Sequence, residues 1–422
     1  NMGVLSVRHP DIYEFINAKS YDANRLVHFN VSVMVDDEFL KAVSNDENFI
    51  LHYPVYDDRG HIIKDDSQWK IKKTIKAKDL WDIIMQKAYD NGEPGILFYE
   101  NLNKDNNTYY MESIINTNPC SEYISGILFG ENLSLESSEY KGACNLGSLF
   151  LHNFIENPFK KDAKINYKKL KDAIYIAVRM LDNIIDINKF PHTHYENYQK
   201  LLRTIGLGIT GLADAMAMLN IKYGSEDSIR FTNDIMNLIS KYTYLASIDL
   251  AAEKGSFPAL NREKFIMSGF IQKHLKIDEE WEYIIDGIRE HGIRNARLIS
   301  VAPTGTLSLT YGENCSSGLE PIFSLEYDRK VKIGGQSESN IQDVKIEDYA
   351  YKLWTQISKE NIVSKDVFVT AMDLPVEAHI DILAAVAFHV DMSCSKTINV
   401  PTEYPFEECK EIYMKAWEKG IK

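Results

Sequence analysis

Hydrophobic and polar positions along the chain alternate between helical and strand periodicity. Residues 27–35 carry an apolar side chain at every second position, which is typical of a strand. Two helix starts are also indicated. Pro10 comes shortly before Ile12, Phe15 and Ile16, which have helical spacing, and Asp36 comes before a segment that is expected to be helical through Val43. The same patterns predict further helices over residues 80–88, 167–187, 212–219, 228–253, 377–390 and 406–419, and further strands over residues 96–99, 149–154, 296–301, 367–370 and 396–400.

This alternation predicts an α/β fold, with strands paired in parallel and helices outside them. A barrel is favoured over an open sheet. We expect residues 1–422 to form one partial α/β barrel domain. The polar and aromatic residues 45–75 are expected to form a surface hairpin or insertion within it.

Composition narrows the functional class. The chain has 422 residues, of which 45% are hydrophobic, and a net charge of −14, which disfavours a nucleic-acid surface. No apolar run reaches the roughly 20 residues of a membrane helix, so we expect no membrane association and a soluble protein. Five widely spaced cysteines without a CxxC pair argue against structural zinc and favour a reducing cytoplasm.

The segment Asn118-Pro119-Cys120-Ser121-Glu122 carries the most informative chemistry. Proline holds such a segment in extended or turn geometry, so the amide, the thiol and the carboxylate can converge on one small ligand. A carboxylate placed there can take a proton from a substrate hydroxyl. The alternative is a buried cysteine in a turn whose glutamate faces water, and for these five residues alone it is the better interpretation.

Residues 302–308, Ala-Pro-Thr-Gly-Thr-Leu-Ser, have the composition of an anion-binding loop. Gly305 would let backbone N–H groups approach an oxyanion, and Thr304, Thr306 and Ser308 add hydroxyl groups. A hydroxyl-capped turn is an equally good interpretation from composition. No Walker lysine follows, so simple ATPase chemistry is not supported.

Three other patterns favour structural interpretations. Residues 206–211 match GxGxxG, but a helix-like rather than strand-like segment precedes them, so we expect close helix packing instead of a dinucleotide site. His192 and His194 lack further ligands and are expected to be solvated loop residues. Asp182 and Asp186 lie four apart on one helix, where solvated or capping roles are expected.

Taken together and in this order, residues 118–122, 142–148 and 303–308 give the sequence a family resemblance. The chain resembles the catalytic subunit of ribonucleotide reductase, most closely the class II, adenosylcobalamin-dependent type. The similarity runs nearly end to end, apart from residues 45–75 and about 260–293. It includes Met2–Leu5, His9–Asp11, Phe29–Val33, Gly92–Gly95, Leu181–Asn183, Ile205–Asp214, Cys315–Pro321 and Ser395–Asn399.

The resemblance implies a ten-stranded α/β barrel in which a central finger loop carries Cys120. Cys120 would become the thiyl radical that removes the 3′ hydrogen of a ribonucleotide. Glu122 would take the 3′-hydroxyl proton and Asn118 would hydrogen-bond the substrate. Cys144 would be one member of the redox-active dithiol. Residues Thr304, Gly305, Thr306, Leu307 and Ser308 would bind the substrate phosphates.

The implied partners are a ribonucleoside di- or triphosphate, a reductant of the thioredoxin or glutaredoxin type, and a second copy in a homodimer. The resemblance also implies that the second dithiol cysteine, the effector site and the C-terminal cysteine tail lie outside this chain. We therefore expect an internal portion of a reductase that cannot complete a reducing turnover alone. Two alternatives stay open: a class I catalytic subunit served by a separate metal-radical subunit, and a non-catalytic nucleotide-binding fragment.

Overall fold

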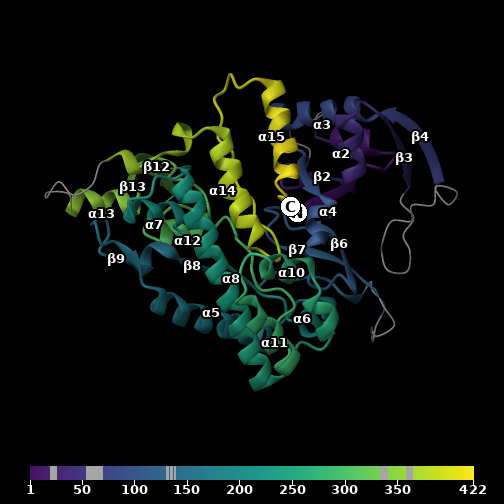
Figure 1. Cartoon of the computed structure of the whole chain (residues 1–422). Coiled ribbons are helices and arrows are strands. Elements are labelled where there is room, and N and C mark those ends of the chain that lie inside the picture. The colour runs from purple at the N-terminus through teal and green to yellow at the C-terminus, as the bar shows by residue number, and fades with distance from the viewer. Residues whose placement is uncertain are drawn as a thin grey trace.

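The computed structural model describes residues 1–19, 26–53, 70–129, 133, 136, 139–332, 341–357 and 365–422. Within these residues no helix is long and apolar enough to cross a bilayer. The strands form one three-stranded sheet and five two-stranded pairs, with helices packed around them (Figure 1). The fold is therefore mixed α/β, as predicted, and no closed barrel is present among the described residues.

The N-terminal part is a parallel sheet with its own core. Strand β2 (Asn30–Val35) lies between β1 (Met2–Ser6) and β5 (Gly95–Phe98). Asp36 then caps α2 (Asp37–Ser44) by accepting the backbone N–H of Phe39 at 2.9 Å, which confirms the predicted helix start. Helix α3 (Ala77–Asn91) covers the same core.

Strands β3 (Asn48–Tyr53) and β4 (Lys70–Lys76) form an antiparallel hairpin. Apart from Lys76, they fall within residues 45–75, where a surface hairpin or insertion is expected, and residues 54–69 of that range lie outside the described residues. Helix α15 (Phe406–Glu418) packs against α3 and also against α14 (Val376–Phe388), so it joins the N-terminal part to the rest of the chain (Figure 1).

Two strand groups organise the middle of the molecule. Strands β6 (Glu112–Thr117) and β7 (Ile124–Leu128) form an antiparallel hairpin. Strand β8 (Leu146–Phe150) pairs in parallel with β11 (Gly206–Thr210). The predicted strand 296–301 lies beside β11 but is joined to its neighbours only by single bridges, Leu207 to Ile299 and Val301 to Cys394.

Most remaining elements are helices, and those within residues 167–291 bury much of the larger core. They are α1 (Ile12–Ile16), α4 (Tyr99–Lys104), α5 (Tyr167–Ile187), α6 (Thr193–Leu202), α7 (Leu212–Met218), α8 (Glu226–Lys254), α9 (Arg262–Ile266), α10 (Gly269–Leu275), α11 (Trp281–His291), α12 (Gly305–Thr310) and α13 (Tyr349–Ile357). Short antiparallel pairs are formed by β9 (Ile155–Glu156) with β10 (Lys164–Ile165), and by β12 (Glu326–Lys332) with β13 (Ile341–Glu347).

Several sequence predictions were wrong in detail. Residues 367–370 and 396–400 contain no strand, and 151–154 form a 3-10 helix rather than the end of a strand. Gly206 and Gly208 of the GxGxxG match lie in a buried strand, β11, and not in a helix contact, while Gly211 stands directly before α7. A side chain at Gly208 would place its Cβ 2.3 Å from the carbonyl oxygen of Ser300, so glycine is needed for close approach of the neighbouring backbone.

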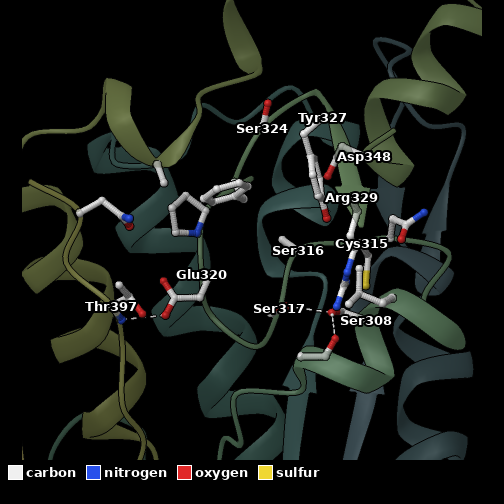
Figure 2. A pocket seen from close by; sticks show the side chains of 17 residues that line it. Ser308, Cys315, Ser316, Ser317, Glu320, Ser324, Tyr327, Arg329, Asp348 and Thr397 are labelled. Atoms are coloured by element: carbon white, nitrogen blue, oxygen red, sulfur yellow. Dashed lines mark hydrogen bonds between the residues drawn. The ribbon is translucent and has the colours of Figure 1, made fainter. Parts of the chain in front are cut away.

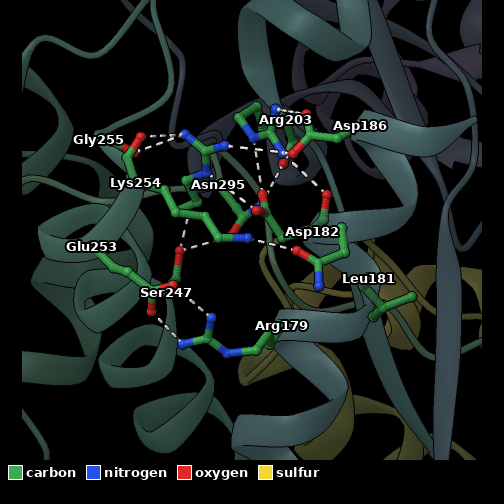
Figure 3. A network of polar contacts seen from close by, with 12 residues as sticks. Arg179, Leu181, Asp182, Asp186, Arg203, Ser247, Glu253, Lys254, Gly255 and Asn295 are labelled. Atoms are coloured by element: carbon green, nitrogen blue, oxygen red, sulfur yellow. Dashed lines mark hydrogen bonds and ion pairs between the residues drawn. The ribbon is translucent and has the colours of Figure 1, made fainter.

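The prediction of a solvated Asp182 was also wrong. Its carboxylate is fully buried and accepts from Arg203 Nε at 2.9 Å and from Arg294 Nε at 3.2 Å. Asp186 receives both terminal nitrogens of Arg203, and Asn295 donates to Asp182 at 3.1 Å (Figure 3). Charged hydrogen bonds of this kind fix geometry. They attach α5 to the segment just before β11 and to the segment that leads to residue 296.

Candidate active site

The turn between β6 and β7 holds three of the predicted site residues. Asn118 closes the turn: its N–H donates to the Tyr123 carbonyl at 3.1 Å, and its Oδ1 accepts the Tyr123 N–H at 3.0 Å. Ser121 takes a left-handed conformation with φ of +62°. Cys120 is therefore presented, exposed, at the tip of a tightly bonded turn, while the amide nitrogen of Asn118 remains available to a ligand.

Glu122 is the unusual group of this turn. Its side chain is buried, at 6% exposure, and its Oε2 has no hydrogen-bond partner among the described residues. Its backbone carbonyl is held by Ser300 Oγ at 2.7 Å and by the Ser393 N–H at 3.2 Å. A buried acceptor without a donor is costly in a native structure and calls for an explanation. A ligand hydroxyl that donates to Oε2 would supply one.

Cys144 lies just before β8, in a segment tied to its surroundings by backbone bonds. Asn145 accepts the Gly206 N–H at 2.9 Å, and the carbonyl of Ala143 accepts Gln199 Nε2 at 2.5 Å. The residue is exposed as a whole, but packing around its thiol raises the pKa of Cys144 to about 11, with the charge of Glu122 adding to this effect.

The same two causes, burial first and the Glu122 charge second, raise the pKa of the Cys120 thiol. One carboxylate therefore acts electrostatically on both thiols. The structure thus brings together Cys120, Glu122 and Cys144, which are up to 24 positions apart in the sequence. All five cysteines are free, and Cys315 and Cys394 are buried.

Tyr123 connects these two segments, and the sequence interpretation missed it. Its backbone closes the turn at Asn118, and its ring lies beside Gly142, in the segment that leads to Cys144. A Cβ built on Gly142 would lie 2.5 Å from the Tyr123 hydroxyl oxygen. That hydroxyl is buried without a partner among the described residues. No sequence signal marks it, because a tyrosine inside a strand is ordinarily a core residue.

A buried ion pair and its hydrogen bonds hold the β6–β7 hairpin in position. The Arg297 guanidinium pairs with the Glu112 carboxylate of β6, and both side chains are fully buried. Tyr198 donates to Glu112 at 2.9 Å, and Arg297 donates to Tyr198 at 2.8 Å. Glu112 also accepts the Gly126 N–H of β7 at 3.0 Å. The network therefore sets where the two hairpin strands stand relative to residue 297.

The segment 304–308 forms the start of helix α12. Thr304 has a left-handed backbone with φ of +53°, and its hydroxyl shares a 2.8 Å hydrogen bond with Thr210 and accepts the Gly318 N–H at 2.8 Å. Through these bonds the Thr304 hydroxyl shapes the turn. Residues 305–307 are exposed, and the first N–H groups of a helix have no acceptor inside it.

A cavity of about 490 Å³ opens beside this segment (Figure 2). Gly305 and Ser308 of α12 line it, together with Arg329 and Tyr327 of β12 and with Glu320. A Cβ added to Gly305 would meet nothing within 4 Å. The sequence interpretation missed the β12 residues, since they lie outside every motif it used.

The histidine pair shows no sign of a metal site. His192 Nδ1 accepts the His194 N–H at 3.2 Å, and His192 is exposed. Within the described part of the chain, no cluster of three or more histidine, cysteine or acidic residues is arranged to hold a metal ion.

Comparison with known proteins agrees with this arrangement. The family model described as ribonucleotide reductase, barrel domain, matches residues 1–422. A vitamin B12-dependent ribonucleoside-diphosphate reductase of Thermoplasma acidophilum is 32% identical over 100% of this chain and 50% of its own length. Its counterpart from Mycobacterium tuberculosis is 32% identical over 100% of this chain and 55% of its own length.

A ribonucleoside-diphosphate reductase subunit alpha of Chlamydia muridarum is 26% identical over 99% of this chain and 43% of its own length. The chain thus spans about half the length of the curated relatives it matches. Because the family model covers every residue, the chain belongs to the ribonucleotide reductase family and corresponds to its barrel domain.

Proposed function

We propose that this chain is the catalytic barrel portion of a ribonucleotide reductase, which converts ribonucleoside di- or triphosphates to 2′-deoxyribonucleotides. The names of the relatives support this reaction class. The observation that carries the proposal is the buried, unpartnered Oε2 of Glu122, a carboxylate whose charge acts on both thiols. A substrate hydroxyl is the donor that this oxygen lacks.

In the proposed reaction Cys120, as a thiyl radical, removes the 3′ hydrogen of the ribose. Glu122 accepts the proton of the 3′ hydroxyl, and the free amide N–H of Asn118 holds the hydroxyl oxygen in place. The turn bonds between Asn118 and Tyr123 keep these groups in fixed positions, which lowers the entropy cost of the step.

Cys144 is proposed to reduce the 2′ position as the 2′ hydroxyl leaves as water. Its raised pKa keeps it a protonated thiol near neutral pH, and a thiol can deliver both a proton and an electron. The burial of Cys315 and Cys394 supports a second dithiol cysteine that is neither of these. A dithiol protein of the thioredoxin or glutaredoxin type would re-reduce the pair.

The substrate phosphates are proposed to bind at residues 304–308. The exposed backbone at Gly305, Thr306 and Leu307 offers N–H groups, and Ser308 offers a hydroxyl in the adjoining cavity. Thr304 acts indirectly, because its hydrogen bonds to Thr210 and Gly318 hold the turn from which the helix starts.

Adenosylcobalamin is the proposed radical source, since two of the relatives described are named vitamin B12-dependent reductases. The described residues do not by themselves define a corrin site: the cavity of about 490 Å³ is assigned here to phosphate, and no donor cluster marks another place. No step above passes through the cofactor. The relative named subunit alpha keeps a separate radical-generating subunit as the alternative.

The proposal extends to the assembly. Completed by the rest of the protein, the parallel segments around β8 and β11 would close as a ten-stranded barrel with the β6–β7 hairpin at its centre. A homodimer and a cytoplasmic location are the corresponding expectations.

Product formation tests the proposal. The chain is incubated with CDP, adenosylcobalamin and excess dithiothreitol, which supplies an external thiol, and dCDP is quantified by chromatography. We expect at most a single turnover to dCDP from the parent chain, because Cys144 lacks its dithiol partner, and no dCDP from Cys120→Ala, while Cys409→Ala, which removes a thiol from α15, matches the parent. Repeated turnover by the parent would contradict the expected lack of a dithiol partner. Binding of CDP without dCDP, and without cofactor-derived radical signal, would favour the non-catalytic nucleotide-binding fragment.

A further inference from the structure

Strand β12 also lines the cavity beside α12, although none of the sequence motifs includes residues of this strand. Arg329 and Tyr327 of β12 alternate along the strand with Asp328, so both side chains fall on the face that lines the cavity. Figure 2 shows the Arg329 side chain directed from the strand toward Ser308 and Ser317. Ser308 belongs to the segment assigned above to the substrate phosphates.

Arg329 has no hydrogen bond or ion pair among the described residues. Every other arginine in the described part of the chain donates to a carboxylate or a backbone carbonyl: Arg8, Arg179, Arg203, Arg230, Arg262, Arg289, Arg294 and Arg297. A guanidinium carries five donors in a planar fork that suits phosphate oxygens. Its lack of a partner is notable in a chain whose net charge is −14.

The acidic groups around the cavity do not neutralise this cation. The carboxylate of Glu320 is paired with Lys396 at 2.6 Å and accepts the Thr397 N–H at 2.8 Å. Asp348 also lines the cavity, but burial, with the nearby Asp214 charge adding to it, raises the pKa of its carboxyl far above the usual range. Asp348 Oδ1 accepts the Tyr351 N–H at 3.0 Å, and no hydrogen bond or ion pair among the described residues joins Asp348 to Arg329. Arg329 is thus the cation of the cavity lining that has no acidic partner.

Two hydroxyl groups complete the polar lining near the guanidinium. Ser308 Oγ lies 2.8 Å from Ser317 Oγ and 3.1 Å from the Gly305 carbonyl oxygen. When Ser308 donates to Ser317, the proton of Ser317 is left to turn toward a ligand. One cation and one hydroxyl donor thus line the same cavity. A phosphate group accepts hydrogen bonds from donors of these two kinds.

We propose that Arg329 binds the outermost phosphate of the ribonucleotide substrate, while the start of α12 binds the phosphate next to the ribose. This rests on the proposed function, and it assigns to β12 a part in recognising how many phosphates the substrate carries. A nucleoside monophosphate would not reach Arg329. A bidentate guanidinium–phosphate contact would therefore favour the diphosphate over the monophosphate by roughly ten- to hundredfold in affinity.

Titration calorimetry with CMP, CDP and inorganic pyrophosphate tests this assignment. The test variant is Arg329→Gln, and the matched control is Lys330→Gln, which removes a positive charge from the next position of the same strand, outside the cavity lining. We expect Arg329→Gln to weaken CDP and pyrophosphate binding roughly ten- to hundredfold and to leave CMP binding unchanged. Lys330→Gln should bind all three as the parent does.

Three results would overturn the assignment, and they are distinguishable. CDP binding that is equal in the parent and in Arg329→Gln removes Arg329 from the site but leaves the proposed function standing. Equal weakening of CMP and CDP would mean that the residue acts on the fold or on the inner phosphate. Pyrophosphate binding that depends on Arg329 but does not compete with CDP would make the cavity a separate anion site.

Discussion

Arg297 and Glu112 form an ion pair that is completely buried beneath the hairpin carrying Cys120, although they are 185 positions apart in the sequence. Glu112 also receives hydrogen bonds from a strand and from a helix, through Gly126 of β7 and Tyr198 of α6. The pair therefore connects the position of the catalytic turn to the centre of the fold.

Removing one partner of this pair should be strongly destabilising. Arg297→Met leaves the Glu112 carboxylate buried without its cation, and we expect the free energy of unfolding to fall by about 3–5 kcal/mol. Urea denaturation followed by circular dichroism measures this. The double variant Glu112→Gln with Arg297→Met should recover part of the loss. A single-variant loss below about 1 kcal/mol would mean that the pair does not hold the hairpin.

The two site thiols should respond together to the charge of Glu122. Its carboxylate raises the pKa of both Cys120 and Cys144, so Glu122→Gln should increase the thiolate fraction at each. We expect alkylation by iodoacetamide at pH 8 to become severalfold faster at both, as measured by peptide mass spectrometry. Cys409, whose pKa is raised by burial alone, is the internal control and should keep its rate. Acceleration at one thiol only would contradict the shared electrostatic centre.

Two glycines should differ sharply in their tolerance of a methyl group. Gly208→Ala would force a Cβ to 2.3 Å from the Ser300 carbonyl oxygen, so we expect a loss of about 1–3 kcal/mol or more in the free energy of unfolding. Gly305→Ala meets nothing within 4 Å and should leave that free energy within about 0.5 kcal/mol. The same chemical denaturation compares them, and equal stabilities would refute the close approach of residue 300 to β11.

Stability should fall in mildly acidic solution because buried histidines resist protonation. Burial, with the Lys273 charge adding to it, lowers the pKa of His389 to about 3, whereas its unfolded value is about 6.5. The unfolded chain therefore binds the proton first, and stability is lost as the pH falls from about 6.5 toward 3, by up to about 1.4 kcal/mol per pH unit for this group. Unfolding free energies measured at several pH values test this.

The variant His389→Leu isolates that contribution. It removes the titrating group, along with the 2.9 Å hydrogen bond to His274, so its stability should depend less steeply on pH than that of the parent. The comparison uses the slope and not the absolute stability, because the substitution also changes packing. An unchanged slope would show that His389 is not the group responsible.

The sequence predicted those elements whose signals are local. Helix α5 has the predicted bounds, Tyr167–Ile187, because its apolar period and its Asn166 cap lie within one continuous segment. The strand predicted over residues 396–400 is absent, because a short apolar run does not reveal whether a partner strand lies beside it. Gly208 was misassigned for the same reason: the backbone that approaches it belongs to residue 300.

In the candidate site, too, the sequence predicted contacts between residues close in the chain and missed contacts between distant ones. The Asn118–Glu122 turn could be read from residue types and spacing within five positions. Asp182 was taken as solvated because its partners, Arg203 and Arg294, lie 21 and 112 positions away. Arg329 carried no signal at all, since an arginine in an exposed strand is ordinary until the fold places it against Ser308.

Release of tritium from 3′-labelled CDP into water tests the central claim most directly, because it reports 3′-hydrogen abstraction without requiring a complete reduction. The chain is incubated with the labelled substrate and adenosylcobalamin, beside Cys120→Ala and Glu122→Gln. The account predicts time-dependent release from the parent, none from Cys120→Ala and strongly slowed release from Glu122→Gln. Release from Cys120→Ala at the parent rate would contradict the assignment of Cys120 as the residue that takes the hydrogen.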